Sequence, residues 1–94
     1  MNKFEECRRI LEFSLVDRFS VRFTPFEGPN PGTSFDFDSG NVAVHGALWS
    51  NLSFDFEAVA LSLGTTVVAE SVRVDGPDEL KRLLDLIIVK VVPA

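Results

Sequence analysis

The sequence predicts an α+β fold, an antiparallel meander sheet of four to five strands with N-terminal and C-terminal helices packed on one face. Near both ends of the chain, apolar residues recur at spacings of three and four, as in amphipathic helices. Between these segments, apolar and polar residues alternate, as in half-buried strands. Short turns separate the strands, which favours antiparallel neighbours. The 94 residues suffice for a single domain, 1–94.

The first helix is expected over residues 3–17, with Asn2 as its cap. Phe13 and Val16 lie off its apolar stripe, which suggests that other parts of the protein pack against this helix on more than one side. Cys7 is on the stripe and is expected to be an inert core thiol. The stripe consists of Phe4, Cys7, Leu11, Ser14 and Leu15.

After the first helix, the spacing of apolar residues changes to every second residue, as in strands. Residues 19–24 alternate, and the proline-rich and glycine-rich segment 25–32 is expected to be a loop. Residues 35–38 alternate again, and 39–41 form a turn or a bulge. Because 35–49 is either two strands or one long bulged strand, the strand count stays at four or five.

The loop after Trp49 decides which residues share a face. A two-residue loop would pair Trp49 with Leu52 and put His45 on the core face. A three-residue loop pairs Trp49 with Ser53 and gathers the large apolar residues on one face. Since a slip of one residue flips every side chain, we predict the three-residue loop. The outer face then carries His45, Trp49, Asp55 and Glu57.

The remaining elements follow in order. After Phe56 the apolar residues change phase, which indicates a bulge near Ala58 or a strand buried on both sides. Residues 66–74 form the last strand. A second helix is expected over 77–91, opened by a proline, with a leucine-rich stripe.

Charge is distributed unevenly along this chain of net charge −5. No Lys or Arg occurs between Arg22 and Arg73. Such a region argues against nucleic-acid binding and favours a basic protein partner, although acids also keep a sheet soluble. The span contains Glu27, Asp36, Asp38, Asp55, Glu57 and Glu70.

Several classes of function are disfavoured. The single cysteine suits a reducing compartment, and the first residues do not resemble a signal peptide. The longest apolar tract is interrupted by Lys90, far short of a membrane helix. No phosphate-binding loop, metal-ligand spacing or nucleophile motif is present, so we expect neither catalysis nor a cofactor. We expect a cytoplasmic binding protein that contacts no nucleic acid and no membrane.

Seven residues are the candidates for partner binding. Trp49 is either a packing aromatic or an exposed interface anchor, and His45 is either structural or functional. The carboxylates alternate with Phe and are expected to be solvated, which suits recognition better than acid–base chemistry. The candidates, all expected on the face of the sheet that the helices leave open, are Asp36, Asp38, His45, Trp49, Asp55, Glu57 and Glu70.

A series of short motifs runs from Phe35 to about Leu84. They are the acidic strand Phe35-Asp36-Phe37-Asp38-Ser39, the strand ending in Trp49, Asp55-Phe56-Glu57, Gly64-Thr65, Val67-Val68-Ala69-Glu70 and the helix start Asp78-Glu79-Leu80. In this pattern the stretch resembles the TriTu family of immunity proteins of bacterial polymorphic toxin systems. The family tends to have a glycine after the Trp turn, where this chain has Ser50-Asn51-Leu52, and the loop 25–32 has no counterpart.

This resemblance implies a protein that binds and neutralises a cognate toxin. The acidic face would suit a basic toxin. A different class is a small acidic secretion chaperone, which would be a dimer with an exposed apolar groove. A structural or accessory domain is a third possibility. The oligomeric state and the toxin are left open by the sequence.

Overall fold

The computed structural model describes residues 2–91 and has the predicted α+β architecture. Its strands form one antiparallel sheet in the order β1-β2-β3-β4-β5. The chain has five strands rather than four because residues 35–49 do not form one long strand. Gly40, with a φ of 60°, makes the turn that joins β2 and β3 as a hairpin. The elements are α1 (Lys3–Val16), β1 (Arg22–Phe26), β2 (Gly32–Ser39), β3 (Val42–Trp49), β4 (Ser53–Ala60), β5 (Thr65–Arg73) and α2 (Pro77–Val91).

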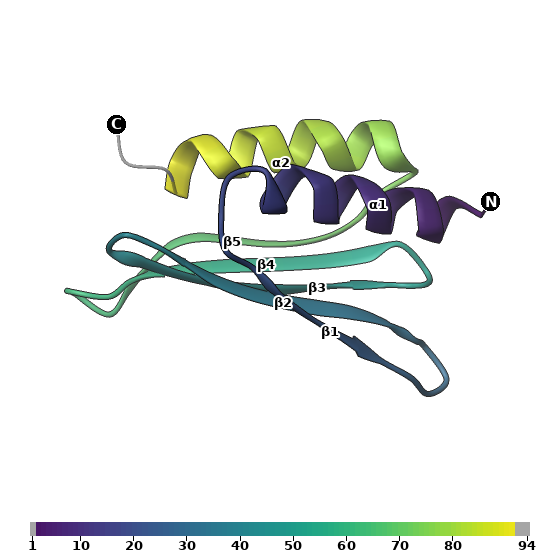
Figure 1. The fold of residues 1–94 in the computed structure, drawn as a ribbon, viewed down its shortest axis with the longest axis horizontal. Coiled ribbons are helices and arrows are strands. Elements are labelled where there is room, and N and C mark those ends of the chain that lie inside the picture. Colours follow the sequence, from purple (N-terminus) through teal and green to yellow (C-terminus); the bar gives the residue numbers. More distant parts are fainter. Residues whose placement is uncertain (1, 92–94) are drawn as a thin grey trace.

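Both helices lie side by side on the same face of the sheet, as expected (Figure 1). The side chain of Asn2 caps α1 by accepting a hydrogen bond of 2.8 Å from the amide of Glu5. Phe13 and Val16 are 77% and 59% exposed. The expectation that α1 is covered on more than one side is therefore wrong, because only its stripe meets the sheet and α2.

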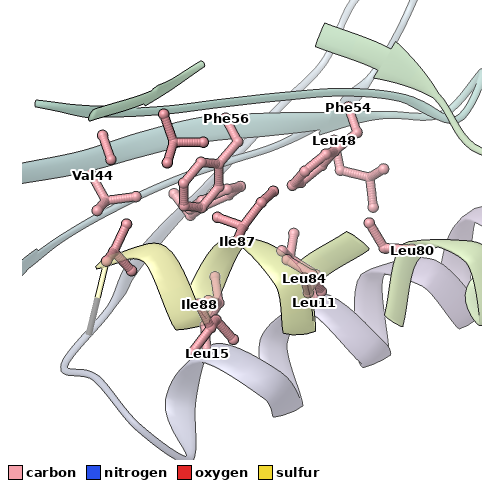
Figure 2. Packing of buried hydrophobic residues seen from close by; sticks show 14 of the residues in the cluster. Leu11, Leu15, Val44, Leu48, Phe54, Phe56, Leu80, Leu84, Ile87 and Ile88 are labelled. Carbon is pink, nitrogen blue, oxygen red and sulfur yellow. The ribbon is translucent and has the colours of Figure 1, made fainter. Parts of the chain in front are cut away.

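Side chains from both helices and the sheet fill the core (Figure 2). Phe35 is 1% exposed, and its ring centroid lies 6.1 Å from that of Phe56. Gly46 pairs with both of these residues. A Cβ at Gly46 would approach the Phe35 ring to 2.6 Å, so glycine is needed where the Phe35 ring crosses β3.

The β3–β4 register confirms the three-residue loop, since Leu48 pairs with Phe54 and His45 with Glu57. Leu52 closes this loop in the left-handed region, with a φ of 70°. The register also shifts between Ala58 and the next residue, which confirms the bulge.

The first strand differs from the prediction. It begins at Arg22 and runs through Pro25 and Phe26, and β2 already starts at Gly32. The loop predicted over 25–32 is therefore shorter. Pro25 is tolerated in a strand because β1 is at the edge of the sheet, where one side of the backbone has no ladder partner.

Candidate functional site on the open face of the sheet

The face of the sheet away from the helices, called the open face here, carries rows of paired side chains. One row crosses all five strands as Arg22, Asp36, His45, Glu57 and Ala69. Arg22 Nε lies 3.8 Å from Asp36 Oδ1, and His45 Nε2 lies 3.0 Å from Glu57 Oε1. These pairs are largely solvated, so each contributes less than about 1 kcal/mol to stability. Their main effect is to set the pattern of charge on the surface.

A second row places Asp55 between Ala47 and Ser71. The Ser71 hydroxyl donates a hydrogen bond of 2.7 Å to Asp55 Oδ1, which orients the carboxylate. Ala47 is small and buried. Because a methyl group fills little space, the surface is lower there than at the neighbouring rows.

Trp49 belongs to a third row and is half-buried, which answers the question left open by the sequence. Its ring meets Phe26 edge to face, with centroids 5.9 Å apart. Gly32 lies between the two residues in the sheet. The indole is therefore packed against Phe26 and remains partly accessible to solvent.

These rows enclose a shallow, open hollow of about 490 Å³ over β3, β4 and β5. Ala47 lies beneath it, with Trp49 and His45 among its lining side chains. Asp55 and Glu57 add carboxylates from β4. The hollow thus combines one aromatic surface with two negative charges.

The structure brings together most of the residues predicted for the site. His45, Trp49, Asp55 and Glu57 all line the hollow, and Asp36 lies in the same row as His45. Asp38 is on the same face but opposite Ala43, beside the β2–β3 turn, and is not among the residues of the hollow.

Glu70 is the one predicted site residue whose side chain does not lie on the open face. It borders the hollow, but it pairs with Phe56, a core residue. Paired residues share a face, and successive residues alternate. The Glu70 side chain therefore lies on the helix-bearing face, and the expectation that it lies on the open face is wrong.

Sequence reasoning missed the two arginines of the open face. Arg22 lies on β1 beside Asp36, and Arg73 lies on β5, where its Nε donates to the Asn51 carbonyl at 2.9 Å. These two arginines bound the part of the sequence that contains no Lys or Arg, and the fold places both of them on the open face. Arg22 alternates with the apolar Phe23 in the sequence, and this alternation could have indicated that Arg22 lies on the open face. The carboxylates of this face are thus partly offset at its two edges.

Within residues 2–91, no group of three or more His, Cys, Asp or Glu side chains is placed to hold a metal ion. None of the helices described for this chain is long and apolar enough to cross a membrane. The fold and the site define a small α+β protein with an open, charged sheet face. Comparisons with family models, curated proteins and solved structures found no match to the chain.

Proposed function

We propose that this chain is a cytoplasmic immunity protein, similar to the TriTu family, that neutralises a basic toxin by binding it through the open face. The observation that carries the proposal is the hollow in which Trp49 lies near Asp55 and Glu57. Both helices pack on the other face, so this face is free to meet a partner (Figure 1).

Charge supports a basic partner. Asp36 and Glu57 have side chains that are 52% and 45% exposed. Exposed carboxylates attract cations over about one Debye length, which speeds encounter with a positively charged protein. Lys and Arg side chains of the toxin would meet these carboxylates at the rim of the hollow.

Trp49 supports an anchored interface. Large aromatic residues dominate binding energies when a partner removes them from water. The edge contact with Phe26 holds the indole before binding. A side chain that is already ordered loses less entropy on association.

The turn after Trp49 is where this chain departs from the pattern of the TriTu family. Leu52 adopts a φ of 70°, a conformation that glycine reaches without strain. The TriTu family tends to have glycine after this turn. The backbone of the turn therefore suits the residue that the family has, although this chain has another one.

The mechanism of such a protein is occlusion. The open face would cover the active site or the substrate groove of the toxin, and the carboxylates would fix its orientation. This action needs precise shape and charge, and it requires no reactive group on the immunity protein.

A secretion chaperone is the second candidate, because apolar side chains are exposed on both helices. Phe13 of α1 is 77% exposed, and Leu86 and Val89 of α2 are 66% and 76% exposed. Such residues would receive an apolar segment of an effector. A dimer in solution would favour this candidate, whereas a monomer would favour the immunity protein.

The test is co-expression with the nearest toxin-like open reading frame, counting surviving cells. Rescue by the chain is expected, together with loss of rescue by the double variant Asp55→Lys/Glu57→Lys. The double variant Glu6→Lys/Asp17→Lys makes the same change in net charge at exposed positions in and just after α1, so it should still rescue. Failure of the unaltered chain to rescue, or unchanged rescue by the first variant, contradicts the proposal.

A further inference from the structure

The outer edge of β5 presents unpaired backbone groups. The Val74 amide donates to the Leu52 carbonyl at 3.0 Å, in continuation of the β4–β5 register. In an antiparallel ladder, pairs that exchange hydrogen bonds alternate with pairs that do not. Every second residue of β5 therefore bonds to β4, and Ala69, Ser71 and Arg73 direct their N–H and C=O groups away from the sheet. No strand lies beyond β5 in the described chain.

The opposite edge of the sheet is protected in a way that β5 is not. The Ser50 amide donates to the Pro31 carbonyl at 2.7 Å, which fixes the residues of β2 that bond to β3. The residues between them bond to β1, so the backbone groups of Phe23 and Pro25 point away from the sheet. Proline has no N–H to donate, a common device for blocking an edge. Over residues 65–73, β5 contains no proline and is nearly twice as long.

We propose that the β5 edge binds an extended segment of a basic protein partner as a sixth strand, with Lys or Arg at alternate positions. This inference rests on the proposed function, because it assumes that the open face meets a basic partner. Backbone hydrogen bonds would supply affinity, and the side chains on the open face would supply specificity.

The charge pattern explains the alternate basic positions. Side chains opposite Ala69 and Ser71 would lie on the open face, at the ends of the rows that contain Glu57 and Asp55. Each of these carboxylates would be two strands away, roughly 10 Å. Ala69 and Ser71 are short, so an extended Lys or Arg could pass over them to the carboxylate.

A second copy of this chain is disfavoured as the occupant. Each copy has a net charge of −5. Pairing of β5 with itself would bring the carboxylates Asp55 and Glu57 of both copies to one face, with Arg73 as the nearby cation. Like charges held close together oppose association.

Binding of synthetic peptides tests the proposal. The probes are blocked peptides of equal length, with Lys at alternate positions, with Glu in its place, or with Lys and N-methylated amides that cannot donate. Fluorescence anisotropy would measure the dissociation constant of each. We expect the Lys peptide to bind at least ~10-fold more tightly than the other two. Equal binding of the methylated peptide would overturn the added strand, and equal binding of the Glu peptide would overturn the charge pattern.

Variants of the protein locate the binding site. Ala69→Pro removes an outward donor and Glu57→Gln removes a charge, so each should weaken the Lys peptide about 10-fold. Glu6→Gln, at an exposed position of α1, is the matched control and should leave binding unchanged. Slower amide exchange at Ala69 and Ser71 on peptide binding gives a readout even if the proline variant misfolds, and unchanged exchange would overturn the proposal.

Two further outcomes separate this proposal from the proposed function. If the chain rescues cells from the toxin but no peptide binds, the open face works without an added strand and the sixth-strand proposal is wrong. If the chain forms a dimer that Ala69→Pro dissociates, the edge pairs with a second copy, which also overturns the proposal.

Discussion

The rings of Phe26 and Trp49 meet edge to face across β2, with centroids 5.9 Å apart. Gly32 makes this contact possible. A Cβ there would lie 2.9 Å from the Phe26 ring and from the Trp49 Cα, and it would also collide with the Leu48 carbonyl oxygen. A backbone position without a side chain therefore shapes one end of the candidate binding face.

Gly32→Ala should destabilise the protein by roughly 1–3 kcal/mol, the usual cost of an added methyl group in filled space. Urea unfolding measures the change in the free energy of unfolding. Gly76→Ala is the matched control, because a Cβ added to Gly76 would have no neighbour within 4 Å. A control effect as large as that of Gly32→Ala would contradict the explanation by crowding.

Phe26→Ala should shift the emission of Trp49 to longer wavelength. Loss of the ring exposes the indole to water, and removing the aromatic contact should cost about 1 kcal/mol. Trp49 is the only tryptophan, so the spectrum has a single source. Phe13→Ala on the exposed side of α1 should leave the emission unchanged. An unshifted spectrum in Phe26→Ala would mean that other groups shield the indole.

Ser39→Ala should cost roughly 1–3 kcal/mol, because it leaves a buried carbonyl without a donor. The Ser39 hydroxyl donates to the Val91 carbonyl at 3.2 Å and ties the β2–β3 hairpin to the end of α2. Ser50→Ala, which removes an exposed hydrogen bond to Asn30, should cost less than about 1 kcal/mol. Equal losses of unfolding free energy in the two variants would show that the Ser39 bond adds nothing.

Cys7 should react with thiol reagents only when the protein unfolds. Its side chain is buried, and burial, with a smaller effect of the Glu6 charge, raises the pKa of the thiol. The thiolate is the reactive form, so both access and ionisation protect the residue. Rapid labelling in native buffer, at a rate similar to that in urea, would contradict this expectation.

The raised pKa of Cys7 also has a consequence for stability. A thiol whose pKa is higher in the folded state contributes fully below the unfolded pKa of about 8.5, and the contribution is lost as the pH rises through the folded value. The urea midpoint should therefore fall above about pH 8.5. This alkaline decline should be smaller in Cys7→Ala, and an identical decline in the variant would assign it to other groups.

Local patterns were sufficient to predict both helices and the central register. The spacing of apolar residues predicted helices that the structure places at Lys3–Val16 and Pro77–Val91. The requirement that large apolar residues share a face selected the pairing of His45 with Glu57. Patterns of this kind depend on side-chain period alone, so they can be read from neighbours in the chain.

Glu70 shows where local patterns fail. Its acidity and its position in a strand suggested the open face, but the side on which it lies depends on its pairing with Phe56. That pairing is set by the loop between β4 and β5 and by the bulge after Ala58. Neither the loop nor the bulge could be placed to within one residue beforehand, and one residue decides the face.

By itself, the sequence determined the α+β class, the order of helices and strands, and an acidic, Phe-lined central region. Tertiary structure alone decided that Gly32 brings Phe26 to Trp49, that Arg22 returns to the open face, and that β5 ends the sheet. Secondary structure follows from the periodicity of nearby residues. Contacts between strands far apart in the chain depend instead on the packing of the whole sheet against its helices.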